Sequence, residues 1–382
     1  MCIARRDMDC VYEAYFESNN HEPDDIPKVS VPLWIFGKKY NALDDIAEIR
    51  QDITSKLWFT YRKNFVPIGG DNGYVSDKGW GCMLRCGQMV LGQALLFSHL
   101  GRDWFWEPGT KDSVYLKILK RFEDARQAPF SIHQIALTGI SEGKPVGHWF
   151  GPNTVAQVLK RLVKYDEWSS LVIHVALDNT IVINDIKELC RKNDISTKLL
   201  RVSWMPLLLV VPLRLGLNEM NPIYISGLKK CFQFKQSLGV IGGKPNLALY
   251  FIGCVGNEVI YLDPHTTQRA GSVNNKENES EIEMDLTYHC KYASRMNMSS
   301  MDPSIAVCFL CKTEGEFNDL CQLIQDNLIL TERQPLFEIS VERPTQWVST
   351  PLTSPDAVVA EAPVSSVPGA PKLDSDSDFE IV

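Results

Sequence analysis

The decapeptide Gly79-Trp80-Gly81-Cys82-Met83-Leu84-Arg85-Cys86-Gly87-Gln88 carries the clearest structural signal in this chain. Two glycines flank Trp80 and free the backbone to turn there. From Met83 to Leu95, apolar residues recur at the spacing of a helix that packs on a core. The pattern therefore predicts a loop that turns into a helix, with Cys82 at the junction.

A cysteine at the start of a helix has a special chemical environment. The first helical turn carries unpaired backbone N–H groups and the positive end of the helix dipole. These surroundings can lower a thiol pKa from about 8.5 to roughly 3.5–7.5, so that a thiolate exists at neutral pH. The same N–H groups can bind the oxyanion that forms when a thiolate attacks a carbonyl. Cys82 is therefore a candidate nucleophile; the alternative is a core cysteine, since free cysteines are usually buried and the chain has eleven.

A thiolate nucleophile needs a general base, and His265 is the best candidate among the seven histidines. It follows two strand-like segments, Leu247–Val255 and Glu258–Leu262. Gly256-Asn257 joins these segments and suits a tight hairpin turn.

Asp263 precedes His265 by two residues, and Pro264 between them disfavours a helical conformation. If this tripeptide continues in extended form, the two side chains point to the same side. The carboxylate could then hold the imidazole in one tautomer while the other nitrogen faces the thiolate. The alternative is an ordinary turn after the hairpin, with Asp263 and Pro264 as turn residues. His133 and His148 are the other candidate bases.

Seven segments of the chain, in register, resemble the autophagins, the cysteine proteases that process a ubiquitin-like modifier in autophagy. The resemblance extends from about residue 30 to about residue 325, and its specificity comes from the combination of motifs. The segments are Leu57–Phe65, Gly79–Gln88, Ser131–Ile135, Phe150–Leu159, Pro206–Gly216, Ser237–Asn246 and Tyr261–Gln268.

The resemblance implies a role for each residue of the motifs. Cys82 in Gly-Trp-Gly-Cys takes the place of the nucleophile, and Asp263 and His265 in Asp-Pro-His complete the triad. Tyr61 takes the place of the tyrosine that assists the oxyanion, for which a phenol O–H is a suitable donor. It also implies a papain-like α/β core with a small helical lobe inserted after the nucleophile helix.

A lid over the site is implied by the same resemblance. It consists of Trp149, which precedes Gly-Pro-Asn, and of the loop that contains Gly242, Gly243, Lys244, Pro245 and Asn246. On its own, Trp149 would be interpreted as a core aromatic residue.

Cys86 follows Cys82 by one helical turn and is expected on the same helix face. An oxidised Cys82 could be resolved by Cys86 as a disulfide, so that Cys86 is a candidate redox residue. The alternative is that Cys86 only packs beneath the helix.

The composition is that of a globular protein, with 382 residues, 45% hydrophobic residues and a net charge of −8. The acidic balance argues against nucleic acid, which needs a basic footprint. The odd number of scattered cysteines and the lack of a signal peptide favour free thiols in the cytoplasm. Cys308 and Cys311 lack a second pair for zinc. A thiol protease needs neither a metal nor an organic cofactor, and none is expected. The short apolar run Leu207–Val211 is expected to be a buried strand of a central sheet.

The chain divides into three regions. Residues 1–27 are expected to form a mobile N-terminal tail, and residues 28–342 the catalytic domain, with a helical lobe at 110–200. Helices are predicted at Val114–Arg126, Thr154–Lys164 and Ile183–Lys192. Residues 343–382 are rich in Pro, Ser, Ala, Val and Asp and are expected to be disordered.

The tail ends in an acidic run followed by Phe379-Glu380-Ile381-Val382. Residues 374–382 resemble a short motif that docks on ubiquitin-like autophagy modifiers, with Phe379 and Val382 in two pockets beside an edge strand. A ligand for a PDZ domain and an inert tail are the alternatives.

Taken with the resemblance, the residues predict a cytoplasmic cysteine endopeptidase that is a monomer. Its expected substrate is a ubiquitin-like autophagy modifier, cut after the C-terminal glycine, both in the precursor and in the form linked to phosphatidylethanolamine. The protease would meet the membrane only transiently, through that substrate. The alternatives are a deubiquitinase-like papain-fold protease and a non-catalytic scaffold that binds the modifier through its tail.

Overall fold

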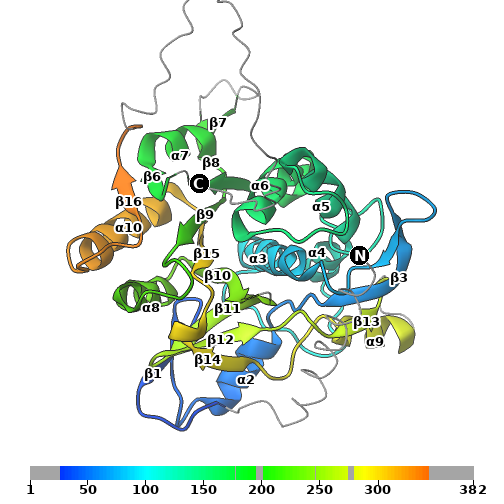
Figure 1. Cartoon of the computed structure of the whole chain (residues 1–382), viewed down its shortest axis with the longest axis horizontal. Helices are drawn as coiled ribbons and strands as arrows, with labels where there is room; N and C mark the ends of the chain where they lie inside the picture. Colours follow the sequence, from blue (N-terminus) through cyan, green and yellow to red (C-terminus); the bar gives the residue numbers. More distant parts are fainter. Residues whose placement is uncertain (1–25, 177, 195–200, 246, 274–278, 344–382) are drawn as a thin grey trace, which may run out of the picture. The chain divides into compact units, whose positions relative to one another are not determined.

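A computed structural model describes residues 26–176, 178–194, 201–245, 247–273 and 279–343 of the chain. Within these residues the core is a nine-stranded sheet (Figure 1). Seven strands lie in the order β14-β12-β11-β10-β15-β9-β5, while β1 pairs with β11 and β2 with β1. The strands are β1 (Pro32–Ile35), β2 (Lys38–Asn41), β5 (Val172–Val175), β9 (Leu207–Arg214), β10 (Ser237–Lys244), β11 (Leu247–Val255), β12 (Glu258–Leu262), β14 (Ser294–Asn297) and β15 (Ser304–Cys311).

Strand β9 shows that both faces of the sheet are covered. Leu208 and Val210 belong to one hydrophobic core, and Leu207, Leu209 and Val211 belong to the other. This division follows from the alternation of side chains along a strand. The buried strand of a central sheet that the apolar run predicted is thereby confirmed.

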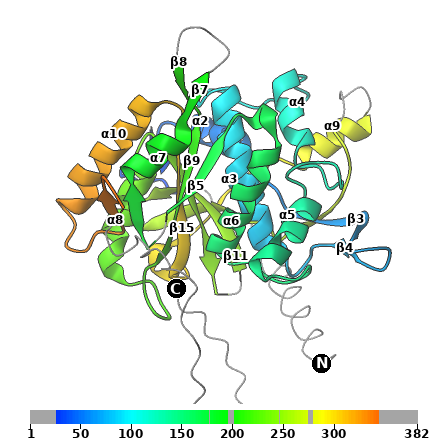
Figure 2. The same ribbon diagram turned by 90° about the horizontal axis from the view of Figure 1, so that it is seen from above.

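Helices cover the two faces, as Figures 1 and 2 show. One face carries α3 (Cys82–His99), α4 (Ser113–Lys120), α5 (Ile132–Gly139) and α6 (Pro152–Leu162). The other carries α7 (Ile183–Cys190), α8 (Ile225–Gln233) and α10 (Glu314–Ile324).

Helix α3 lies within the core rather than on the surface. Every residue from Cys82 to Phe97 is buried, and the helix packs on β10, β11 and α6. A helix that is buried on all sides has the continuous apolar character seen in this sequence. This packing fixes the position of the N-terminal end of the helix, where Cys82 lies.

A smaller sheet lies beside the main one and consists of β3 (Tyr61–Ile68), β4 (Tyr74–Ser76) and β13 (Thr267–Arg269). Strand β13 pairs with β3 in parallel, with Thr267 opposite Tyr61. The start of β3 is thus held next to the segment that follows β12. The remaining α-helices and strands of the described residues are α2 (Ile46–Thr54), β6 (Thr180–Val182), β7 (Arg191–Asp194), β8 (Arg201–Trp204), α9 (Glu279–Leu286) and β16 (Glu338–Ser340).

The structure corrects the helical lobe expected at 110–200. Helix α4 ends at Lys120 rather than at Arg126, because the chain then folds into turns. Strand β5 pairs in parallel with β9 and so belongs to the central sheet. A short apolar run fits a strand or a buried helix equally well, and here the pairing with β9 decides between them. In contrast, the hairpin predicted around Gly256-Asn257 is confirmed in β11 and β12.

The compact unit of the chain ends at Arg343, which forms an ion pair with Asp185 at 2.6 Å. At the other end, Ile26 packs against the core. The predicted tails, 1–27 and 343–382, otherwise lie outside the described residues. In the part of the chain that the structure describes, no helix combines the length and apolar character needed to span a membrane.

Candidate active site

Cys82 is the first residue of α3 and is only 2% exposed. Gly79 adopts a φ of +86°, which suits glycine. A Cβ on Gly81 would lie 2.3 Å from Oδ2 of Asp77. These two glycines therefore allow the chain to turn directly into the helix, and the predicted junction at Cys82 is confirmed.

His265 lies in a turn that follows β12, not in the extended segment that the sequence favoured. Oδ1 of Asp263 accepts a hydrogen bond from the backbone N–H of His265 at 2.9 Å and lies 2.5 Å from its Nδ1. The carboxylate bonds to the backbone two residues ahead, which folds the segment into a turn. The two side chains still meet, as the extended form would also have allowed. Trp58 also holds this turn, because its Nε1 donates to the Asp263 carbonyl at 2.7 Å.

The environment of Cys82 stabilises a thiolate. Burial alone would raise the pKa of the Cys82 thiol, but a hydrogen bond with His265 and the charge of that imidazole oppose it. A backbone hydrogen bond from Ala248 of β11 and a side-chain hydrogen bond from Tyr61 act in the same direction. Together they hold the pKa of Cys82 below its ordinary value.

The pKa of His265 changes in the opposite direction. Burial favours the neutral imidazole, but hydrogen bonds to Asp263 and to Cys82 outweigh it and raise the pKa of His265 to about 9. Its side chain is 1% exposed, so water screens these interactions little. A lowered thiol pKa beside a raised imidazole pKa shifts the pair toward thiolate and imidazolium.

Tyr61 lies against the imidazole. Its ring meets that of His265 edge to face, with centroids 5.4 Å apart. The backbone N–H of Tyr61 donates to the carbonyl of Pro264 at 2.9 Å. The strand that carries the phenol and the turn that carries the imidazole are therefore tied to one another.

The proposed lid residues line a cavity of about 250 Å³ next to the start of α3. Its walls include Met83 of α3, Trp149, and Gly242, Gly243 and Lys244 of β10. Trp149 is 48% exposed, which excludes the alternative of a core aromatic residue. Gly79 and Met83 in this wall place the cavity beside the N-terminal end of α3.

The loop expected at residues 242–246 is shorter than predicted. Gly242, Gly243 and Lys244 are the end of β10 and pair with the start of β11. A Cβ on Gly243 would lie 2.0 Å from the carbonyl oxygen of Leu247, so the glycine lets the two strands approach closely. Pro245 is an exposed turn residue, and Asn246 lies outside the described residues.

The alternative bases are placed elsewhere. His133 is buried, with Nε2 2.6 Å from the carbonyl oxygen of Val66. His148 is exposed in the segment before Trp149. His265, in contrast, lowers the pKa of Cys82 through a hydrogen bond and through its charge.

Cys86 is fully buried, and this burial raises the pKa of its thiol well above the ordinary value. The redox role of Cys86 stays a prediction, as does docking through Phe379 and Val382, which lie outside the described residues. Two contacts at the site were not expected from the sequence: the backbone hydrogen bond from Ala248 and the Trp58 indole. The hydrogen bond from the Ala248 backbone leaves no signature in the pattern of side chains. Trp58 does have a signal, because it lies within the segment Leu57–Phe65 that resembles the autophagins.

An activated thiol at a helix N-terminus, with an imidazole and a carboxylate beside it in an α/β fold of the papain-like kind, defines a cysteine-type peptidase. The family model described as "Peptidase C54 catalytic domain" matches residues 46–323. The chain belongs to this family, the autophagins.

Relatives of known description extend over nearly the whole chain. A "Cysteine protease ATG4B" from Gallus gallus is 45% identical and covers 96% of this chain and 98% of its own. A "Cysteine protease ATG4A" from Xenopus laevis is 44% identical, with 94% of each chain covered. The Homo sapiens "Cysteine protease ATG4A" is 44% identical over 94% of this chain and 95% of its own.

Proposed function

We propose that this protein is a cysteine endopeptidase that cleaves ubiquitin-like autophagy modifiers after their C-terminal glycine. The observation that carries the proposal is the arrangement of Cys82, His265 and Asp263 beside a small cavity that is lined by glycines and Trp149. The names of the relatives place them among the proteases of autophagy, and this supports the choice of substrate.

In the proposed reaction, the Cys82 thiolate attacks the carbonyl carbon of the substrate glycine and forms a tetrahedral oxyanion. The backbone N–H of Cys82 and the O–H of Tyr61 donate hydrogen bonds to that oxyanion. The imidazolium of His265 gives its proton to the departing amine, which leaves a thioester on Cys82. His265, now neutral, takes a proton from water, and the hydroxide equivalent releases the modifier and the thiolate. Asp263 orients His265 through both steps.

The cavity accounts for selectivity in this proposal. A glycine has no side chain, so it can pass a constriction at Trp149 and β10 that would exclude larger residues. The bond from that glycine to a following residue and its bond to phosphatidylethanolamine are both amides. The same site would therefore process the precursor and remove the lipid. We place the enzyme in the cytoplasm as a monomer that meets a membrane only through its lipid-linked substrate.

The test uses the modifier with an electrophile in place of its C-terminal carboxylate. The wild-type chain should be captured covalently at Cys82, and Cys82→Ala should bind the modifier reversibly without capture. A ubiquitin probe of the same chemistry is the control for substrate class. Capture by ubiquitin alone would indicate a deubiquitinase, and reversible binding of the modifier without any capture of the wild type would indicate a scaffold.

Turnover of the precursor gives the second measurement. Cys82→Ala should lose on the order of a million-fold in rate, and His265→Ala nearly as much, because these groups act as one unit. His133→Ala and His148→Ala serve as matched controls. Inactivation by either control, with His265→Ala still active, would refute the assignment of the base.

A further inference from the structure

A buried ion cluster lies behind the candidate site and consists of Asp77, Arg85 and Asp124. Arg85 is on α3, one turn after Cys82, and donates to Asp77 through Nε at 2.8 Å and Nη2 at 3.0 Å. Its Nη1 donates to Asp124 at 2.9 Å and to Gln88 at 3.0 Å. Arg85 and Asp77 are at most 1% exposed. This cluster is not part of the chemistry described above.

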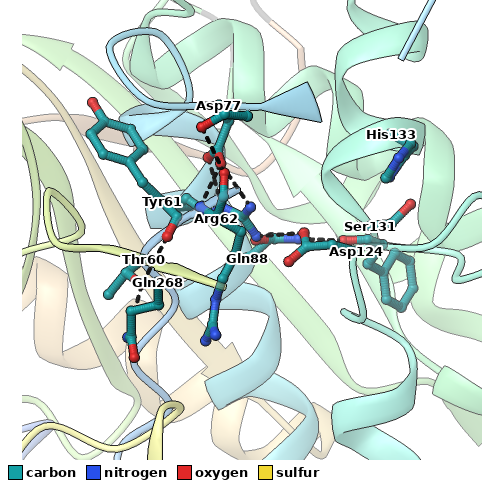
Figure 3. A network of polar contacts seen from close by, with 12 residues as sticks. Thr60, Tyr61, Arg62, Asp77, Gln88, Asp124, Ser131, His133 and Gln268 are labelled. Atoms are coloured by element: carbon teal, nitrogen blue, oxygen red, sulfur yellow. Dashed lines mark hydrogen bonds and ion pairs between the residues drawn. The ribbon is translucent and has the colours of Figure 1, made fainter. Parts of the chain in front are cut away.

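Asp77 connects the nucleophile helix to the strand of Tyr61 (Figure 3). Its carboxylate accepts the backbone N–H of Arg62, the residue after Tyr61, at 2.7 Å. Its own carbonyl accepts the N–H of Gly81, the residue before Cys82, at 2.8 Å. Asp77 is thus bonded to Gly81, which precedes the proposed nucleophile, and to Arg62, which follows the proposed oxyanion donor.

The connection continues to the imidazole. Tyr61 donates its backbone N–H to the carbonyl of Pro264, which lies between Asp263 and His265. A continuous series of short hydrogen bonds therefore runs from the turn of His265, through the start of β3, to Asp77 and the first turn of α3. A shift of Asp77 would change the position of the helix terminus relative to both partners of the thiolate.

The guanidinium of Arg85 gives this connection a defined orientation. A bidentate guanidinium–carboxylate pair fixes both distance and angle, unlike a single hydrogen bond. The opposite side of Arg85 is held by Asp124 and Gln88, and Gln88 itself donates to the carbonyl of Phe130 at 2.7 Å. Arg85 is thereby anchored independently of β3 and can hold Asp77 in place.

We propose that Asp77, held by Arg85, is a positioning residue that sets the placement of Cys82 relative to His265 and Tyr61. The proposal rests on the proposed function for its substrate, but its geometry concerns only the reactivity of Cys82. In this role Asp77 neither touches the substrate nor exchanges a proton. It acts through the two backbone segments to which it is bonded.

The test compares Asp77→Asn with Asp124→Asn in the full-length protein. Asp77 uses both carboxylate oxygens for three donors, so the amide NH₂ of asparagine must face at least one of them. The bond from Arg85 to Asp124 uses one oxygen, which asparagine retains. Both variants remove one buried carboxylate, so Asp124→Asn controls for lost charge and lost stability.

We expect Asp77→Asn to lower kcat for the modifier precursor by about 10–100-fold with KM changed less than about twofold, since small misplacements of reacting groups have effects of this size. Asp124→Asn should stay within about threefold of the wild type. Equal losses in the two variants, at a temperature where both show a cooperative thermal transition, would overturn the proposal.

A second readout separates this proposal from the proposed function. The rate of Cys82 alkylation by iodoacetamide needs no modifier, and it should fall in Asp77→Asn but not in Asp124→Asn. A wild type that fails to cleave the modifier refutes the proposed function, whereas an unchanged alkylation rate in Asp77→Asn refutes the positioning role. If Asp77→Asn does not fold, Arg85→Lys keeps the charge but loses the bidentate pair. It should then show the same kcat loss at constant KM, and wild-type kcat in Arg85→Lys would overturn the proposal.

Discussion

Replacement of Asp263 by asparagine tests the electrostatics of the proposed pair directly. The pKa of His265 is raised from 6.5 to about 9 against the effect of burial, with the hydrogen bond to Asp263 as the largest opposing cause. A rise of this size corresponds to ~3 kcal/mol of extra stabilisation of the imidazolium. In Asp263→Asn, the carboxylate no longer offsets the effect of burial on His265, so the pKa of His265 should fall. The pKa of Cys82 should rise, because a neutral imidazole no longer stabilises the thiolate.

The assay is the pH dependence of Cys82 alkylation, followed by mass spectrometry of the peptide that contains it. Burial raises the thiol pKa of the other cysteines that the structure describes, which are Cys86, Cys190, Cys231, Cys254, Cys290, Cys308, Cys311 and Cys321. Among the described cysteines, Cys82 should therefore react first. At pH 6.5 we expect Asp263→Asn to react about 10–100-fold more slowly than the wild type, since each pKa unit is a factor of ten in thiolate. Superimposable profiles would refute the reasoning.

The matched control is Asp285→Asn. Asp285 is another buried carboxylate near a histidine, but it accepts hydrogen bonds from Trp106 and Tyr115. Its loss should leave the alkylation profile of Cys82 unchanged. The same profile change in Asp285→Asn and Asp263→Asn would show that the effect comes from general loosening of the fold.

The pH dependence of stability has a definite sign. Because the folded pKa of His265 is raised, the stabilisation is complete below about 6.5 and is lost as the pH rises through about 9. The free energy of unfolding of the wild type should therefore exceed that of Asp263→Asn most clearly below pH 6.5. The difference should shrink toward pH 9 in denaturant titrations; a difference that grows with pH would contradict the assignment.

Three further predictions concern other parts of the molecule. Cys86→Ser should change the recovery of activity by reductant after peroxide treatment, because the resolving thiol is lost; identical titration and recovery would leave Cys86 a packing residue. Phe379→Ala should weaken binding of the modifier and slow cleavage of the membrane-linked form more than that of a soluble precursor near saturation, because the tail adds effective concentration. Equal modifier affinity of the full chain and of a chain lacking the C-terminal tail would exclude docking. Gly242→Ala should lower kcat/KM by about tenfold or more, because Gly242 lines the cavity and its Cβ would lie 2.8 Å from Cγ2 of the buried Ile305, so that the cavity wall must shift. Wild-type activity of a folded Gly242→Ala would show that Ile305 gives way without moving the wall.

The sequence predicts those features that depend on local rules. The start of α3 follows from two glycines and a helical apolar pattern, and the β11–β12 hairpin from Gly256-Asn257 between two apolar runs. The turn at Asp263 was only the alternative to an extended tripeptide. The hydrogen bond between the Asp263 carboxylate and the backbone of His265 fixes just two residues, so no longer sequence pattern predicts it. The resemblance supplied Tyr61 and Trp149, whose side-chain types alone are common in hydrophobic cores.

Features that depend on pairing across the chain could not be predicted in this way. The short apolar segment Val172–Val175 could by its sequence belong to a strand or to a buried helix. Its pairing with β9 makes it strand β5. Arg85 was visible in the opening decapeptide, but its partner Asp124 lies 39 residues away and has no motif around it. The hydrogen bond from Ala248 to Cys82 belongs to the backbone and would exist with other side chains.

The burial of α3 has a consequence for the protein while it is being synthesised. The helix is covered by β10 and β11, and the thiol is activated by His265, all of which leave the ribosome long after Cys82 does. Before those segments arrive, the helix lacks its packing partners, and a long loop must still be closed. The nascent chain therefore carries Cys82 as an ordinary thiol, and a reactive nucleophile appears only when the domain is complete.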